Sequence, residues 1–278
     1  MGKRENNVRM DSIMNKAISV SKLSKCFNGI SAVDGISFEV EEAELFGFLG
    51  PNGAGKTTTI NILCGLMNPT SGEARVNGFD VMSSPTEVRK SIGIIFQDPS
   101  LDERLTAHEN LNFHGMIYHL PPKIRKARID EVLNMVGLYS KKHNIVRTFS
   151  GGMKRRLEIA RGLMHRPKVL FLDEPTIGLD PQTRQYIWDY ILTLSEMEKI
   201  TVFLTTHYMD EAEICQRVAI MDHGKIVDID MPDTLKNKYR VSSLNEVFLH
   251  VTGREIREGE SHGKERLGVF LRARHKMR

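Results

Sequence analysis

Residues 45–57 consist of a continuous apolar run followed by a glycine-rich loop, Leu45-Phe46-Gly47-Phe48-Leu49-Gly50-Pro51-Asn52-Gly53-Ala54-Gly55-Lys56-Thr57. The loop fits the pattern GxxxxGK[ST], and residues 57–67 after it have a helical pattern that Asn68-Pro69 ends. A strand, a loop of small residues and a helix in this order let backbone N–H groups surround a phosphate, and the helix N-terminus adds partial positive charge. The alternative, a glycine-rich turn that matches by chance, is disfavoured by the strand and the helix on either side.

The loop side chains give this segment a defined chemistry. Lys56 is expected to reach the β and γ phosphates of a nucleotide, and Thr57 to offer its hydroxyl to Mg²⁺. We therefore predict a phosphate site made by one continuous segment, Gly50, Pro51, Asn52, Gly53, Ala54, Gly55, Lys56, Thr57 and Thr58.

A second apolar run, residues 169–172, ends in two carboxylates, Asp173 and Glu174. Parallel sheets place ligands at the carboxyl ends of their strands, so both acids are expected near the phosphate loop. Asp173 is predicted to hold Mg²⁺ and Glu174 to polarise the attacking water. The alternative is a strand that ends in two solvated acids, and the loop earlier in the chain favours the catalytic interpretation.

Further apolar runs predict an α/β fold. Residues 18–23 and 36–40 alternate, which indicates an antiparallel edge layer, whereas residues 92–96 and 201–205 are continuous runs typical of buried parallel strands. Two runs joined by His223-Gly224 predict a hairpin, residues 217–221 and 225–230.

The pattern also divides the chain into parts. Residues 1–16 lack periodicity and are predicted to be a flexible arm, and residues 17–240 form the body, with a helical subdomain at about 98–166. Residues 241–278 are a C-terminal extension that ends in a basic tail. For this tail two interpretations stay open, a solvated segment and a segment that lies on an anionic membrane surface.

Charge and hydropathy narrow the functional classes. The net charge of +4 divides into +2 in residues 1–16, +4 in residues 253–278 and −2 between them. A nearly neutral body lacks the basic stripe of a nucleic-acid-binding domain, so no nucleic-acid partner is expected. No apolar run approaches the ~18 residues that span a bilayer, so neither a membrane span nor secretion is expected.

The isolated cysteines fit a reducing compartment and are predicted to be small core residues, Cys26, Cys64 and Cys215.

Four further motifs resemble those of the ATP-binding subunits of ABC transporters. Ser150-Gly151-Gly152-Met153 is similar to the signature motif of that family, Gln97 to its Q-loop, Gly178-Leu179-Asp180 to its D-loop and His207 to its switch histidine. Their order and spacing match over about residues 18–230. The resemblance implies a P-loop NTPase (RecA-like) fold of the α/β class, with a mainly parallel core, an antiparallel β layer and an inserted helical subdomain.

Departures from the usual signature point to one branch of the family. Phe149 replaces Leu, Met153 replaces Gln, and basic residues 154–156 follow. This combination resembles the drug-resistance branch, of the daunorubicin-resistance type, which works with ABC-2 type permeases. Residues 207–213 and 244–249 resemble that branch as well.

The resemblance implies roles for residues outside the loop. Ser150, Gly151 and Gly152 would clamp the nucleotide held by a second copy of the chain, with Asp180 across the interface. Gln97 would sense the γ-phosphate and Mg²⁺, His207 would touch the γ-phosphate, and Phe27 would stack on adenine. The alternatives are an ordinary helix cap for Ser150, solvated side chains for Gln97 and His207, and a core aromatic for Phe27.

The expected function is that of a Mg-dependent ATPase that powers a separate membrane permease, in the manner of an exporter. Such a subunit is expected to lie in the cytoplasm, peripheral on the inner face of the cell membrane. The alternative is a soluble ABC ATPase without a transport role, but neither long coiled-coil insertions nor a second cassette is found in the sequence. A nucleotide-binding regulator that does not hydrolyse ATP is disfavoured because Glu174 and His207 are both present.

Overall fold

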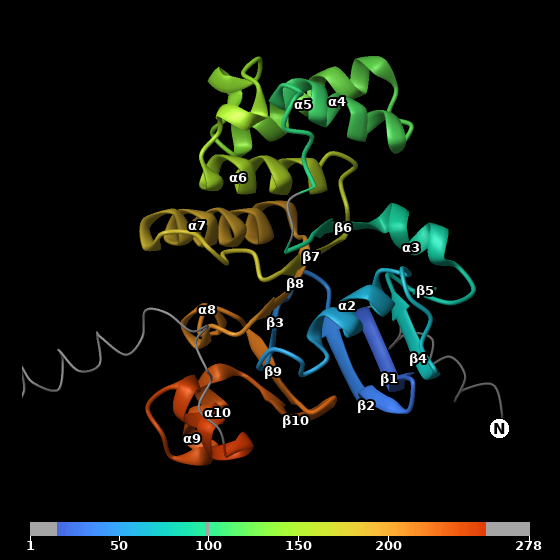
Figure 1. Cartoon of the computed structure of the whole chain (residues 1–278), viewed down its shortest axis with the longest axis vertical. Coiled ribbons are helices and arrows are strands. Elements are labelled where there is room, and N and C mark those ends of the chain that lie inside the picture. The colour runs from blue at the N-terminus through green and yellow to red at the C-terminus, as the bar shows by residue number, and fades with distance from the viewer. Residues whose placement is uncertain (1–15, 98–99, 254–278) are drawn as a thin grey trace, which may run out of the picture.

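The computed structural model describes residues 16–97 and 100–253, which form two sheets and a set of helices (Figure 1). The predicted arm and basic tail lie outside the described residues, apart from Lys16 and Gly253 at their edges. None of the described helices is both long enough and apolar enough to cross a membrane.

The larger sheet has six strands and is parallel except at one edge. Its order is β10-β9-β3-β8-β7-β6, and only the β10–β9 pair is antiparallel. The strands are β3 (Leu45–Leu49), β6 (Ile92–Ile95), β7 (Val169–Asp173), β8 (Thr201–Thr206), β9 (Arg217–Asp222) and β10 (Lys225–Asp230). The predicted parallel core and the predicted hairpin are therefore confirmed.

A smaller antiparallel sheet lies beside it, with the order β2-β1-β4-β5. Its strands are β1 (Lys16–Phe27), β2 (Ile30–Glu41), β4 (Ser71–Val76) and β5 (Phe79–Asp80). The predicted edge layer is confirmed, and its first two strands are longer than the alternating runs that predicted them.

Apolar side chains on both faces of the large sheet explain why its strands are continuous apolar runs. Phe46 and Phe48 of β3 pack toward the antiparallel sheet. Their rings cluster with Phe38 of β2 and Phe203 of β8, and the ring centroids lie 5.4 to 6.0 Å apart. Leu45 and Leu49 face the opposite way, into the cluster that includes the helical lobe. Every residue of β3 is buried, as parallel strands covered on both faces require.

Helices cover the sheet and form the inserted lobe. In Figure 1, α4, α5 and α6 lie together at one end of the molecule and α7 runs between them and the large sheet. The helices are α2 (Lys56–Leu63), α3 (Pro85–Ser91), α4 (Ala107–Ile117), α5 (Pro122–Met135), α6 (Gly151–Gly162), α7 (Pro181–Glu198), α8 (Met209–Ala212), α9 (Pro232–Tyr239) and α10 (Leu244–Thr252), with 3-10 turns at Tyr139–Lys141 and Val146–Thr148. Helices α4, α5 and α6 fall within the residues expected to form the helical subdomain.

Two local expectations are wrong. The helix after the phosphate loop ends at Leu63 and not at Met67, because Gly65 follows with φ +63°, a conformation that stops an α-helix. Cys26 is exposed near the end of β1, although Cys64 and Cys215 are buried as expected. The last residues of β1 extend beyond the sheet core, so side chains there are not covered.

Candidate nucleotide-binding site

The phosphate loop connects β3 to α2 and depends on glycines at its two ends. A Cβ at Gly50 would lie 2.4 Å from the Met221 carbonyl oxygen, and one at Gly55 would lie 2.3 Å from the Ala32 carbonyl oxygen. Gly55 also has φ +109°, which side chains strongly disfavour. Packing against the sheet and against β2 therefore requires glycine at both positions, whatever the loop binds.

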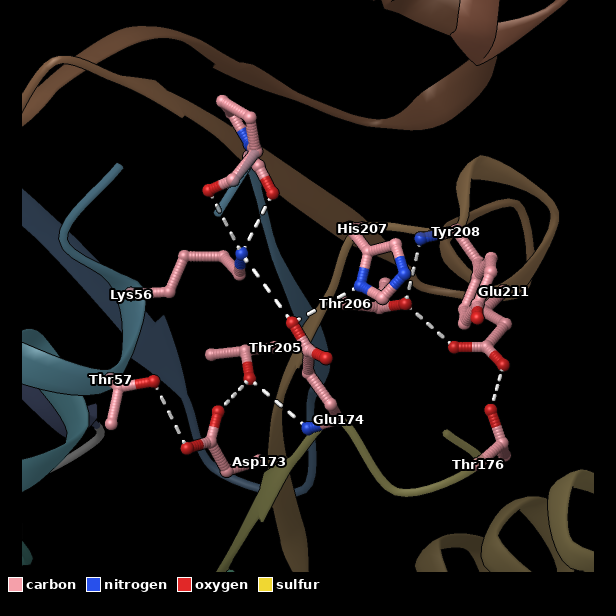
Figure 2. A network of polar contacts seen from close by, with 12 residues as sticks. Lys56, Thr57, Asp173, Glu174, Thr176, Thr205, Thr206, His207, Tyr208 and Glu211 are labelled. Carbon is pink, nitrogen blue, oxygen red and sulfur yellow. Dashed lines mark hydrogen bonds and ion pairs between the residues drawn. The ribbon is translucent and has the colours of Figure 1, made fainter. Parts of the chain in front are cut away.

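Lys56 begins α2 and turns its ammonium back over the loop, as Figure 2 shows. Its Nζ donates to the carbonyl oxygens of Gly50 at 2.7 Å and Pro51 at 3.2 Å, and it lies 3.6 Å from Glu174 Oε1. Burial lowers the pKa of Lys56, and the nearby carboxylates of Glu174 and Asp173 oppose that shift. The loop thus holds a buried cation at its centre.

Asp173, the last residue of β7, lies between two hydroxyl groups. Thr57 Oγ1 donates to its Oδ2 at 3.1 Å, and Thr205 at the end of β8 donates to Oδ1 (Figure 2). The side chains of Asp173 and Thr57 offer oxygen atoms only, which are the ligands that Mg²⁺ prefers, and that ion commonly uses one carboxylate together with phosphate oxygens. Among the described residues there is no larger cluster of His, Cys, Asp and Glu that could enclose a metal ion. The donor set therefore fits a cation that is bound jointly by protein and phosphate.

Glu174 follows directly and has an unusual backbone. Its φ is +47°, in the left-handed region, and its N–H donates to the Thr205 carbonyl at 3.1 Å. Its carboxylate is buried, and Oε1 lies 3.1 Å from His207 Nδ1 as well as near Lys56. Burial alone raises the pKa of this carboxyl, but the contact with His207 and the Lys56 cation lower it below the usual value for Glu.

A second polar network next to this carboxylate holds the residues on either side of His207. Thr206 Oγ1 accepts from the Tyr208 amide at 2.9 Å and donates to Glu211 Oε2 at 2.7 Å, and Thr176 donates to Oε1 of the same side chain (Figure 2). Glu211 is buried in α8. The residues on either side of His207 are therefore fixed to the loop that follows Glu174.

The signature and the D-loop come together at a different place. Ser150 caps α6 by accepting from the Met153 amide at 3.3 Å, and Asp180 caps α7 by accepting from the Thr183 amide at 2.9 Å. A Cβ at Gly152 would lie 2.4 Å from Thr183 Cγ2, so the two helix N-termini are in contact. A hollow of about 210 Å³ lies beside them, lined by Ser150, Gly152, Met153, Arg156, Gln182, Thr183 and Tyr186.

The signature itself makes no direct polar contact with the phosphate loop. No hydrogen bond or ion pair within residues 16–97 and 100–253 links the signature to the phosphate loop.

Gln97 follows β6 with an exposed side chain, and Phe27 ends β1 with 42% of its surface exposed and Lys25 Nζ 5.0 Å from its ring centroid. Phe27 is therefore not the core aromatic of the alternative interpretation.

Several residues of the site were not predicted from the sequence. Thr205 bonds to Asp173 and to the Glu174 amide, Thr206 bonds to Glu211 beside His207, and Arg155 reaches the backbone of the same region. The hydroxyls at the end of the buried strand Thr201–Thr206 were an available signal, because polar groups that close an apolar parallel strand lie at the ligand-binding edge. Glu211 gives no such signal, since its sequence neighbours are ordinary helical residues.

A phosphate loop between β3 and α2, two carboxylates at the end of β7 and an inserted helical lobe define the ATP-binding cassette class of P-loop ATPases. The family model for the ABC transporter matches residues 33–177, and the chain belongs to this family. It is an ATPase of the ABC transporter type.

Relatives and solved structures agree with this assignment. The chain is 41% identical to the linearmycin resistance ATP-binding protein LnrL of Bacillus subtilis (strain 168), over 84% of this chain and 77% of that one. It is 44% identical to the daunorubicin/doxorubicin resistance ATP-binding protein DrrA of Streptomyces peucetius, over 76% of this chain and 64% of DrrA. An ATP-binding subunit of an ABC transporter superimposes with a TM-score of 0.75 at 28% identity, covering 85% of this chain and 99% of that one. The dimeric cassette MJ0796 in a post-hydrolysis state with ADP and Pi superimposes with a TM-score of 0.70 at 27% identity, covering 77% and 98%.

Proposed function

We propose that this chain is the ATP-hydrolysing subunit of an exporter, that two copies enclose ATP between them, and that it drives an ABC-2 type permease from the cytoplasmic face of the membrane. The observation that carries the catalytic part is the position of Glu174. Its carboxylate is buried, ionised and held between Lys56 and His207 beside the phosphate loop. No other carboxylate among the described residues combines these partners with that place.

The roles of the residues follow from their chemistry. Lys56 exchanges the carbonyls of Gly50 and Pro51 for phosphate oxygens and stabilises negative charge on them. Glu174 orients the attacking water and accepts its proton, because its low pKa keeps it ionised. Thr57 and Asp173 would hold Mg²⁺, which supplies positive charge to the phosphates when bound. Phe27, whose side chain is exposed, stacks on adenine.

The proposed dimer accounts for the second group of residues. Ser150 offers a hydroxyl and lies at the N-terminus of α6, which favours an anion. No hydrogen bond or ion pair among the described residues links it to the phosphate loop of its own chain, which supports a site completed by the signature of another copy. MJ0796, a cassette of the same fold, is dimeric in its solved structures.

The proposed permease contact is on the helical lobe. Phe113, Met116 and Ile117 of α4 are more than half exposed and lie on one face of that helix, at spacings of three and four residues. The same helix reaches the segment that follows Gln97. The Asn110 side chain donates to the Asp102 carbonyl at 3.0 Å and accepts from the Asp102 amide at 2.9 Å. Leu101, also in that segment, is partly buried against the core.

Removal of the Lys56 ammonium tests the catalytic site. We expect Lys56→Ala to lose ATP binding or turnover, because the phosphates lose the buried cation at the centre of the loop. ATP affinity and Mg-dependent phosphate release are the measurements. Lys90→Ala removes an exposed ammonium that pairs with Glu87 and should change neither. Wild-type hydrolysis by Lys56→Ala would contradict the site.

A further inference from the structure

Three charged side chains of α6 face the catalytic region. Arg155, Glu158 and Arg161 recur every third residue on the helix that begins at the signature. Arg155 is 7% exposed and Glu158 is 2% exposed, and they form an ion pair at 3.0 Å. Buried charges are retained only with partners, so their other contacts show what they hold.

Arg155 donates to four backbone carbonyls from two separate segments. Its Nε contacts the Pro175 oxygen at 2.6 Å, and Nη2 contacts the oxygens of Asp173 at 3.4 Å and Glu174 at 3.3 Å. Its Nη1 contacts the Phe96 oxygen at 2.7 Å, directly before Gln97. One planar guanidinium therefore joins the end of β7 to the end of β6.

Glu158 and Arg161 hold Ser100, which follows Gln97 in the chain, whereas Arg155 holds Phe96 before it. Glu158 Oε1 accepts from the Ser100 amide at 2.9 Å while its Oε2 keeps the ion pair with Arg155. Arg161 Nη1 donates to the Ser100 carbonyl at 2.6 Å. Both flanks of Gln97 are thus attached to α6, at Phe96 and at Ser100.

These contacts bear on the geometry of Glu174. Its left-handed backbone, φ +47°, is sparsely populated by residues other than glycine and persists only where neighbouring groups hold it. Arg155 binds its carbonyl and both neighbouring carbonyls, and only a rigid fork of donors can reach all of them together. Lys offers the same charge from a single point.

We infer that Arg155, locked by Glu158, is a positioning residue that sets the direction of the Glu174 carboxylate and the position of Gln97 together. This inference rests on the proposed roles of Glu174 and Gln97. Because Ser150 heads the same helix, an anion docked at the signature acts on these backbone groups through little more than one helical turn.

The experiment compares Arg155→Met, Arg155→Lys and Glu158→Gln in the full-length chain. We expect single-turnover ATP hydrolysis to slow about 100-fold in Arg155→Met and about 10-fold in Arg155→Lys, as for a catalytic group that is misplaced but present. ATP affinity should change less than about threefold, because the phosphate loop is untouched. Thermal unfolding identifies any variant that fails to fold. If Arg155→Met fails to fold, the hydrolysis rates of Arg155→Lys and Glu158→Gln, whose side chains keep nearly the original volume, test the positioning role.

Arg128→Met is the matched control. Arg128 is also buried, pairs with Glu131 and donates to the Leu163 carbonyl at 2.8 Å inside the lobe, away from the catalytic carboxylates. It should lower stability but leave hydrolysis at the wild-type rate. Folded Arg155 variants with wild-type rates, or an equal loss in Arg128→Met, would overturn the positioning role. Glu174→Gln in the same assay separates the two proposals, because rapid hydrolysis by that variant refutes the catalytic site itself.

Discussion

Glu174 shows how one residue is prepared by groups from three other parts of the chain. Lys56 comes from the phosphate loop, Thr205 and His207 from the end of β8, and Arg155 from the signature helix. Burial would favour the neutral acid, but the contact of Glu174 with His207 and the nearby Lys56 cation reverse that preference. The carboxylate is therefore ionised because of its neighbours and against the effect of its burial.

The opposing effects on the pKa of Glu174 predict how the hydrolysis rate depends on pH when one neighbour is removed. In His207→Ala the pKa of Glu174 should rise, since burial is then opposed by Lys56 alone. Activity that needs the ionised form is lost as pH falls through that pKa, so the acid limb of the normalised rate profile should move to higher pH. Single-turnover rates between pH 4 and pH 8 measure the shift. An acid limb at the wild-type position would show that His207 does not control this carboxyl.

At the scale of elements, α4 and α6 enclose two histidines in the lobe. Both rings lie beside Tyr118, whose ring centroid is 4.9 Å from that of His114 and 3.7 Å from that of His165, and the two histidine centroids are 6.1 Å apart. Burial, with Arg161 and His165 nearby, lowers the pKa of His114 to about 3. Burial and Arg128 lower the pKa of His165 to about 4, although its contact with the Ile92 carbonyl opposes the shift.

These neutral histidines predict acid sensitivity of the lobe. Unfolded chains bind a proton at each histidine below pH ~6.5, whereas the folded protein does not until about pH 3 or 4. The free energy of unfolding therefore falls as pH drops from 6.5. Between pH 7 and pH 5 each histidine should contribute a loss of about 2 kcal/mol.

Urea denaturation of His114→Phe at both pH values tests this element. Between pH 7 and pH 5 the variant should lose about 2 kcal/mol less free energy of unfolding than the wild type, because only one of the two histidines, His165, is left. His143→Phe, at an exposed position, should keep the wild-type loss. Equal losses in wild type and His114→Phe would show that His114 binds a proton in the folded state.

The elements also show what the sequence could predict. Strands buried on both faces, such as β3 and β7, were evident as continuous apolar runs that end in chemically distinctive residues. β4 was missed because only Ala74 and Val76 of its six residues are buried, so its alternation is weak. The network around Glu211 joins α8 to residues more than thirty positions earlier in the chain, and no local pattern reveals such a contact.

At the scale of the whole molecule, the separation of the signature from the phosphate loop predicts assembly. Glu174→Gln should bind ATP but hydrolyse it slowly, so the nucleotide-bound dimer should accumulate and appear by light scattering at saturating ATP and Mg²⁺. Adding Ser150→Arg should prevent the dimer, because bulk and a cation replace the small capping hydroxyl. A monomeric Glu174→Gln variant under these conditions would contradict the shared site for the isolated chain.

The permease contact is a second prediction at this scale. Phe113→Arg should release the chain from membranes that contain its permease while basal ATP hydrolysis persists, because Phe113 is 61% exposed and belongs to an apolar helix face. Sedimentation after co-expression measures the association. Met197→Arg changes a side chain on α7 that is even more exposed, at 78%, and should remain bound. Release of both variants from the membranes, or of neither, would contradict a permease contact on α4.

The contact between Gly152 and Thr183 has an evolutionary consequence. A side chain at position 152 would meet the Thr183 methyl at 2.4 Å, so the second glycine of the signature is required by the packing of α6 on α7, independently of nucleotide. Serine at position 183 would remove that methyl and keep the hydroxyl bonded to Asp180. Among natural variants we therefore expect the two positions to change together, with alanine at 152 inherited only alongside a smaller residue at 183.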